Sequence, residues 1–227
     1  TPEYFRKTGF IYTDFLGNAN TATLEAQLPF DVEVINSGTI RKAVSLPAHP
    51  GLMTITSSTT ANSGAYIETH SSAFLLSGGE AFELIFLSPP QTGIRTIRFG
   101  YLDTTSSSDA IDGVYFEIID TTLKGKSSNN STQSITASTY NIATTAWYRA
   151  ILQIDDNATQ ANFYVYNCNN GKLVWSDSVT GNIPTQTGRT TGAGVVATND
   201  GTTPVSIIHL DYMALWKLKS DGTGYVR

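Results

Sequence analysis

Residues 161–177 read ANFYVYNCNNGKLVWSD, and this stretch decides the fold class. Apolar and polar side chains alternate through Ala161–Asn167, which is the period of a half-buried β-strand. Asn169-Asn170-Gly171 then supplies residues that tolerate a positive φ, and Lys172–Asp177 continues as a second strand-like run. The stretch therefore predicts an antiparallel β-hairpin.

The same alternation recurs along the chain on both sides of this hairpin, while no segment keeps the 3.6-residue period of an amphipathic helix. Clusters of Gly, Pro, Asn and Asp separate the short runs, as in β-sandwiches and barrels. A dozen or so strands in a chain of this length predicts an all-β fold, a two-sheet antiparallel β-sandwich of jelly-roll type. The predicted strands are Val32–Ile35, Ile40–Leu46, Leu52–Ser57, Ala65–His70, Glu80–Leu87, Thr96–Leu102, Val114–Ile119, Gln133–Thr136, Trp147–Ile154, Ala161–Tyr166, Lys172–Asp177, Gly194–Thr198 and Val205–Trp216.

The domain organisation is expected to be simple, because 227 residues suit one large β domain. Residues 1–30 have weak periodicity and predict an N-terminal arm or linker, whereas residues 31–227 predict a single jelly-roll domain. The polar stretches Thr104–Asp112 and Gly125–Ser131 predict loops or hairpin tips inside that domain.

The composition limits the classes of function. Charged residues are 15% of the chain, the formal net charge is −5, and Lys and Arg form no cluster. Electrostatic binding to nucleic acid is therefore not expected. The longest apolar runs, such as Val114–Ile119, are far shorter than the ~20 residues that span a bilayer, so we expect no membrane insertion. One cysteine, Cys168, excludes an intrachain disulfide and a Cys-rich zinc site.

One set of outward-facing side chains forms a candidate ligand-binding face. If their strands are neighbours, alternation places several polar and aromatic residues on one side of a sheet, and a tryptophan adds a ring. Jelly rolls hold saccharides on such faces through stacking rings and bidentate donors. The alternative is a solvated sheet surface with cross-strand Arg–Glu and Arg–Tyr pairs, which is the default for antiparallel sheets. The candidate residues are Arg98, Tyr115, Glu117, Arg149, Gln153 and Trp175.

Paired catalytic carboxylates are not expected. A retaining glycosidase needs two carboxyl groups roughly 5–5.5 Å apart. Glu80 and Glu83 are three residues apart, as are Glu117 and Asp120, so each pair falls on opposite faces of its strand. We therefore predict no catalytic residues and a non-enzymatic protein.

The histidines and one acidic loop are weaker candidates for chemistry. A polysaccharide lyase would need a His beside a Tyr, and His70 and His209 are the strand-borne histidines. His209 is more often a hydrogen-bonded strand histidine than a base. Asp103, Asp109 and Asp112 fall in one stretch and are a low-ranking Ca²⁺ site, since their spacing is not that of an EF-hand. No other cofactor is expected.

Several short runs, taken in order, resemble an uncharacterised domain of tailed-bacteriophage structural proteins, found in tail fibres, head fibres and other surface appendages. The resemblance extends from about Leu46 to Trp216 and implies a concanavalin-like jelly roll, but it implies no catalytic or ligand residues. The runs are His49-Pro50-Gly51, Glu80–Phe86 after a Gly-Gly pair, Asp112–Glu117, Trp147-Tyr148, Ile183-Pro184, Gly188-Arg189 before Gly192-Ala193-Gly194, Gly201-Thr202-Thr203 and Asp211-Tyr212.

The resemblance implies a virion surface structural protein, such as a capsid decoration, head fibre or tail fibre, with an extracellular location and host-surface glycans as the candidate ligand. Appendages of this kind are symmetric oligomers, so we expect self-association as a homotrimer and contacts with other virion proteins. The alternative is a carbohydrate-active module on the same fold, either resembling a polysaccharide lyase or glycosidase or purely carbohydrate-binding.

Overall fold

The computed structural model describes residues 7–13, 30–43, 49, 51–89, 94–199 and 206–218. In these ranges the regular elements are all strands, and no helix is long and apolar enough to cross a membrane. The strands are β1 (Lys7–Thr13), β2 (Asp31–Ile35), β3 (Thr39–Lys42), β4 (Met53–Thr56), β5 (Gly64–Glu68), β6 (Glu80–Leu87), β7 (Arg95–Leu102), β8 (Gly113–Ile119), β9 (Thr122–Asn129), β10 (Thr132–Ile135), β11 (Tyr140–Asn141), β12 (Trp147–Ile154), β13 (Gln160–Asn167), β14 (Lys172–Thr180), β15 (Gly192–Asn199) and β16 (Ser206–Leu218).

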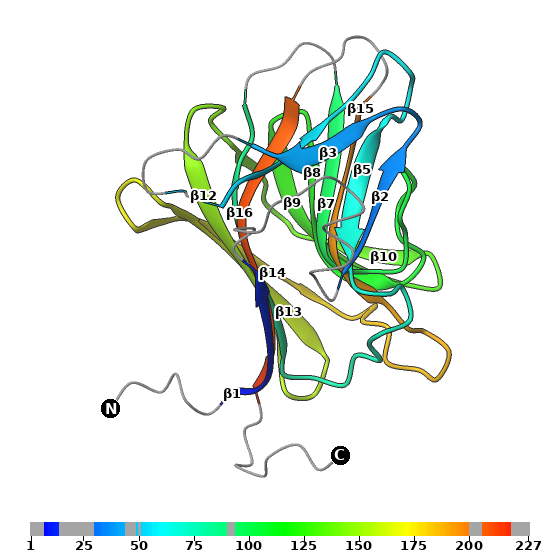
Figure 1. Cartoon of the computed structure of the whole chain (residues 1–227). Helices are drawn as coiled ribbons and strands as arrows, with labels where there is room; N and C mark the ends of the chain where they lie inside the picture. The colour runs from blue at the N-terminus through cyan, green and yellow to red at the C-terminus, as the bar shows by residue number, and fades with distance from the viewer. Residues whose placement is uncertain are drawn as a thin grey trace.

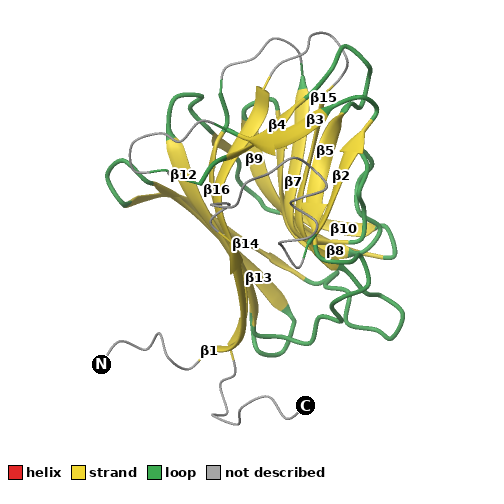
Figure 2. Cartoon of the chain, viewed as in Figure 1, coloured by secondary structure: helices red, strands yellow, loops and turns green. Residues whose placement is uncertain are grey.

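The strands form two sheets that lie face to face (Figures 1 and 2). Sheet A has the order β14-β13-β12-β6-β16-β4-β3, with β1 also paired to β16, and sheet B has the order β10-β9-β8-β7-β15-β5-β2, with β11 paired to β9. Every pairing is antiparallel. The predicted fold class, a two-sheet antiparallel jelly roll, is confirmed.

Aromatic side chains join the two sheets across the core. The ring centroids of Phe86 and Phe99 are 5.4 Å apart, and those of Phe99 and Phe116 are 4.9 Å apart in a stacked pair. Phe116 then meets Phe163 edge-on at 5.0 Å. These four rings are fully buried; Phe86 and Phe163 come from β6 and β13 of sheet A, and Phe99 and Phe116 come from β7 and β8 of sheet B, so the rings hold the two sheets together.

The hairpin predicted over residues 161–177 is present as β13 and β14. Gly171 has a φ of 67° and donates its backbone N–H to the Asn167 carbonyl at 2.8 Å, which closes the turn. In Figure 1 the strands of sheet A bend along their length, and the hollow side of the bend is turned away from sheet B. We call this side the outer face of sheet A, and the corresponding side of sheet B its outer face.

Part of the predicted N-terminal arm is a strand of the sandwich. β4 pairs with the first residues of β16, up to Leu210, while β1 pairs with Met213–Leu218. The two short strands therefore share one edge of β16, which is longer than either of them. The prediction of an arm or linker is wrong for residues 7–13; residues 14–29 lie outside the described residues, and the remaining domain limits stay a prediction.

The second polar stretch, Gly125–Ser131, is also mispredicted, because most of it belongs to β9. A Cβ at Gly125 would lie 2.6 Å from the Phe163 ring, so a side chain would collide with the core. The Ser127 hydroxyl donates to the Gly181 carbonyl at 2.8 Å. Close approach and hydrogen bonding select small polar residues here, which hides the alternation of a strand. The stretch Thr104–Asp112 is a loop, as predicted.

Candidate functional site

The structure divides the predicted ligand-binding residues between the two sheets. Arg98, Tyr115 and Glu117 lie on β7 and β8 in sheet B, whereas Arg149 and Gln153 lie on β12 in sheet A. The expectation that these five share one face is therefore wrong. Alternation along a strand predicts the face of each side chain, but it does not predict which sheet receives the strand.

Trp175, the sixth predicted residue, lies in the core rather than on an outer face. Its ring centroid is 6.4 Å from that of Phe116, and its Nε1–H donates to the Ser138 hydroxyl at 3.1 Å. Trp175 is opposite Val165 in the β13–β14 register, and Val165 is fully buried. The indole thus packs between the sheets, with its one polar atom hydrogen-bonded.

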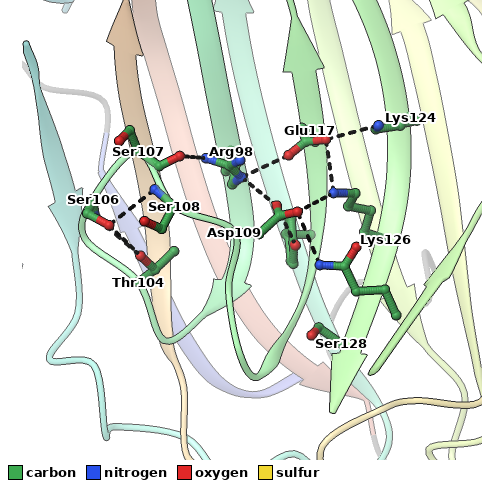
Figure 3. Close-up of polar contacts among 12 residues, drawn as sticks. Arg98, Thr104, Ser106, Ser107, Ser108, Asp109, Glu117, Lys124, Lys126 and Ser128 are labelled. Carbon is green, nitrogen blue, oxygen red and sulfur yellow. Dashed lines mark hydrogen bonds and ion pairs between the residues drawn. The ribbon is translucent and has the colours of Figure 1, made fainter. Parts of the chain in front are cut away.

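On sheet B, a network of ion pairs lies beneath the loop 103–112 (Figure 3). Arg98 Nε is 2.9 Å from Glu117 Oε2, and the ammonium groups of Lys124 and Lys126 each lie 3.1 Å from Glu117 Oε1. Asp109 enters this network from the loop. We call these five residues the loop-covered ion cluster.

Asp109 holds the loop on the sheet. Its Oδ1 accepts hydrogen bonds from Arg98 Nε at 3.0 Å and the Tyr115 hydroxyl at 3.1 Å, and its Oδ2 accepts from Lys126 at 2.7 Å and Gln133 at 3.1 Å. Partial burial opposes ionisation, yet the hydrogen bonds from Lys126 and Gln133 hold the pKa of Asp109 well below its usual range. The network is a structural fastening of the loop.

The predicted residues in this cluster are covered. Arg98, Tyr115 and Glu117 are all buried, and Glu117 is only 1% exposed. Arg98 also donates through Nη1 to the Ser107 carbonyl at 2.8 Å, so the loop uses the donors that a ligand would need. These three side chains are therefore covered by the loop and are not presented to a ligand.

The three aspartates of the predicted Ca²⁺ site have separate partners. Asp103 Oδ1 accepts from the Ile111 N–H at 3.0 Å, and Asp112 Oδ2 lies 3.2 Å from Arg189 Nη1, while Asp109 belongs to the loop-covered ion cluster. Across the part of the chain that the structure describes, no three His, Cys, Asp or Glu side chains are arranged to hold a metal ion.

The outer face of sheet A gathers the remaining predicted residues with several that the prediction missed. In register, Arg149 lies opposite Tyr166 on one side and Ile85 on the other, and Ile85 lies opposite Tyr212. The row therefore crosses β13, β12, β6 and β16 with two tyrosines, one arginine and one isoleucine. All four side chains are partly exposed.

An arginine–glutamate pair lies at the centre of this face. Arg149 donates through Nε to Glu83 Oε1 at 2.6 Å and through Nη2 to Glu83 Oε2 at 3.0 Å. The arginine side chain is 41% exposed, while that of the glutamate is 9% exposed. The Arg149 guanidinium carbon is 6.0 Å from the centroid of the Tyr166 ring. This bidentate pair fixes the guanidinium beside an aromatic ring at the surface.

The next rows of the same face are polar and aromatic. Ile151 lies opposite Tyr164 and Glu83, and Gln153 lies opposite Asn162. Tyr164, Gln153 and Asn162 are half-buried, so each presents part of its side chain to solvent. The predicted residues Arg149 and Gln153 thus share one face with tyrosines that the prediction left out.

A histidine–aspartate pair lies on sheet A, where β16 has a bulge. The register of β16 with β6 shifts between Leu210 and Tyr212, and Asp211 is the extra residue. His49 Nδ1 is 2.7 Å from Asp211 Oδ2, and the imidazole stacks on the Trp147 ring at a centroid distance of 3.9 Å and an angle of 15°. The two residues are 162 positions apart in the sequence, so local periodicity cannot predict their contact.

Cys168 lies within electrostatic range of both pairs. Its exposed thiol has a raised pKa, through desolvation first, with Asp211 and Glu83 adding to the rise and Arg149 opposing it. Charged groups of the arginine–glutamate pair and of the histidine–aspartate pair therefore both affect the pKa of this thiol. We call Glu83, Arg149, Tyr166, His49 and Asp211 the sheet A site.

The other predicted histidines and carboxylates have ordinary structural partners. His209 Nδ1 lies 2.6 Å from the Thr54 hydroxyl, and burial lowers the pKa of its imidazole. His70 is exposed, and its Nδ1 lies 2.8 Å from the Ser72 hydroxyl. Glu80 accepts hydrogen bonds from the Ser77 and Gly78 N–H groups, away from the Arg149 partner of Glu83. The two carboxylates do not form a pair.

The sheet order and the antiparallel register define a concanavalin-like β-sandwich. The chain belongs to the SO2946-like family, whose C-terminal domain matches residues 48–211. A search of curated protein sequences finds no match.

Solved structures share this fold at low sequence identity. A protein of unknown function, SO2946 from Shewanella oneidensis MR-1, is 19% identical with a TM-score of 0.76, and the alignment covers 100% of this chain and 93% of that one. Peanut lectin is 12% identical with a TM-score of 0.56, covering 92% and 97%. The CBM2 module of the evolved Dit of Lactobacillus casei BL23 phage J-1 is 9% identical with a TM-score of 0.56, covering 97% and 98%. At these identities the likeness establishes the fold.

Proposed function

We propose that this chain is a non-enzymatic glycan-binding module that works at the surface of a bacteriophage virion, and that glycans bind to the outer face of sheet A. The observation that carries the proposal is the Arg149–Glu83 pair, 41% exposed on the arginine side, beside Tyr166. Sugars are recognised by rings that stack on their apolar faces and by fixed polar groups that pair with their hydroxyls. The sheet A site combines both in one row of the register.

The rigidity of this site also favours binding. Glu83 and Arg149 come from the neighbouring central strands β6 and β12, and the bidentate contact fixes both side chains. A polar group that is already ordered loses little conformational entropy when a ligand arrives. The loop-covered ion cluster of sheet B also pairs an arginine with a glutamate, but its Arg98 and Glu117 are buried, and Arg98 donates to Glu117, Asp109 and the Ser107 carbonyl.

Binding to a glycan array tests the proposal. We expect the intact chain to bind at least one oligosaccharide, and Tyr166→Ala to weaken that binding at least tenfold. Tyr66→Ala is the matched control, because Tyr66 is a half-buried tyrosine on sheet B whose hydroxyl donates to Glu33 at 2.6 Å. Loss of binding in Tyr66→Ala with full binding in Tyr166→Ala would contradict the proposed surface.

The virion setting has separate support. The short runs described above resemble bacteriophage structural domains, and one structure with the same fold is a module of a phage Dit. A capsid decoration, head fibre or tail fibre would place the chain outside the cell, as a homotrimer in contact with other virion proteins. Light scattering coupled to chromatography tests the oligomer: a mass about three times that of the chain is expected, and a monomer would contradict the trimer.

A carbohydrate-active enzyme is the second candidate, and the His49–Asp211 pair is the observation that favours it. A carboxylate that binds Nδ1 of an imidazole fixes its tautomer and orientation, which is an arrangement used in acid–base catalysis. Release of reducing ends or unsaturated uronates from a polysaccharide panel tests this candidate. Turnover that disappears in His49→Ala would replace the non-enzymatic proposal.

A further inference from the structure

We infer that the sheet A site selects neutral sugars and excludes uronates and other acidic sugars. The inference rests on the proposed function, because it names the class of ligand for the same face. It follows from how the charges of this face are paired, and it is independent of which neutral sugar binds.

The cation of the site already holds a carboxylate. An acidic sugar binds most strongly when a guanidinium donates two parallel hydrogen bonds to its carboxylate. Arg149 makes this bidentate contact with Glu83, at 2.6 and 3.0 Å. A uronate would have to displace Glu83, which is nearly buried and is fixed to the central strand β6 of the same sheet.

The remaining charges of the site do not attract an anion. Besides Arg149, the site holds the carboxylates of Glu83 and Asp211 and the imidazole of His49, which lies 2.7 Å from Asp211. Arg149, Glu83 and Asp211 together contribute one positive and two negative charges. The carboxylate of an acidic sugar would therefore add a third negative charge to a site whose arginine is already paired with Glu83, and like charges repel.

The surroundings of Cys168, which lie near the same charges, also disfavour a negative charge. Desolvation is the largest cause that opposes formation of its thiolate; Arg149 favours the thiolate, whereas Asp211 and Glu83 oppose it. An anion at the position of this thiol is therefore disfavoured. The loop-covered ion cluster of sheet B has three cations and two carboxylates, but its Arg98 and Lys126 are buried, so it does not offer these cations to an acidic ligand.

The uncharged groups of the face suit a neutral ligand. Half-buried Tyr164, Tyr166 and Tyr212 offer ring surface and hydroxyls, and Gln153 beside Asn162 offers amides. Each of these groups exchanges hydrogen bonds with sugar hydroxyls without a charge on the ligand. A neutral oligosaccharide can use them while the Arg149–Glu83 pair stays intact.

The test compares ligands that differ only in charge. The probes are hexagalacturonate and its full methyl ester, together with an array that contains neutral hexose oligosaccharides and their uronate counterparts. We expect the intact chain to bind neutral members at least ten times more tightly than the matched acids. Equal or tighter binding of the acids would overturn the inference and leave the proposed glycan face standing, whereas no binding to either class would contradict both.

Variants separate charge selection from folding. Glu83→Gln frees Arg149 from its carboxylate, so we expect at least a tenfold gain in uronate affinity relative to neutral sugar. Glu33→Gln makes the same change on the exposed strand β2 of sheet B and should leave the ratio unchanged. If Glu83→Gln does not fold, Asp211→Asn removes the second carboxylate and should shift the ratio in the same direction. A folded variant at either position with an unchanged ratio would overturn the inference.

Discussion

Glu68 is expected to make the stability of this protein depend on pH, and Glu68→Gln should remove that dependence. The side chain lies on β5 at 2% exposure, and its Oε2 has no hydrogen-bond partner among the described residues. Asp31 is its register partner on β2. Desolvation raises the pKa of Glu68 from 4.5 to about 8, and the charges of Asp31 and Asp103 add to the rise.

The sign follows from proton linkage. Between the two pKa values, the folded state retains a proton that the unfolded chain has released, so the free energy of unfolding falls as pH rises through this window. The contribution of Glu68 is most favourable below about pH 4.5 and becomes constant above about pH 8. One unit of difference in pKa corresponds to about 1.4 kcal/mol. The loss between pH 4.5 and neutral pH is therefore on the order of 3 kcal/mol for this buried group.

Urea unfolding of the intact chain and Glu68→Gln at pH 5, 6, 7 and 8 measures this contribution. Glutamine resembles the protonated carboxyl in shape and has no charge, so the variant should gain about 3 kcal/mol relative to the intact chain between the lowest and highest pH. Glu33→Gln, on the neighbouring strand β2, is the matched control and should follow the intact chain. Parallel curves of unfolding free energy against pH for the intact chain and Glu68→Gln would show that Glu68 does not cause the pH dependence.

Three further predictions concern the loop-covered ion cluster, one glycine and the cysteine. Asp109→Asn should lower the free energy of unfolding by about 1–2 kcal/mol at neutral pH, since the carboxylate is partly exposed and its loss leaves Arg98 and Lys126 less compensated. Because folding lowers the pKa of Asp109, its contribution to the free energy of unfolding is present above the ordinary carboxyl range and is lost as pH falls. If the free energy of unfolding of Asp109→Asn falls in acid as steeply as that of the intact chain, this expectation is contradicted. Gly100 has a φ of 137°, and a Cβ there would lie 2.7 Å from the Val114 carbonyl oxygen. We therefore expect Gly100→Ala to lower the free energy of unfolding, measured by thermal unfolding, by at least about 2 kcal/mol. Gly171→Ala, in open space, should cost less; the reverse order would count against the register of β7 and β8. Cys168 should react with iodoacetamide near pH 8 more slowly in the native chain than in urea, because desolvation raises the pKa of its native thiol; equal rates would show that the pKa of the thiol is not raised in the folded chain.

Local features of the fold were predictable from the sequence, and distant pairings were not. The hairpin at 161–177 depends on alternation and a turn within 17 residues, so periodicity suffices. Arg98 and Glu117 were correctly placed together, because their strands are consecutive and pair directly. β12 joins the other sheet beside β6, which depends on the packing of the whole core.

The sheet A site shows the same limit. Arg149 and Gln153 were found because they are outward on one strand, but Glu83, His49 and Asp211 reach them only through tertiary structure. The alternation of β16 does not reveal the bulge at Asp211, although Asp211-Tyr212 is one of the runs that carry the resemblance to phage structural domains. Strand β9 was not predicted either, because the close approach of Gly125 to Phe163 is a tertiary contact and requires a residue that interrupts the alternation.

Hydroxyl-radical footprinting of tyrosine side chains, with and without the tightest-binding oligosaccharide from the array, tests whether glycans bind to the outer face of sheet A. We expect the ligand to protect Tyr164, Tyr166 and Tyr212 on that face and to leave Tyr66 on sheet B unchanged. Protection of Tyr66, with no change at the three sheet A tyrosines, would contradict the proposed glycan face.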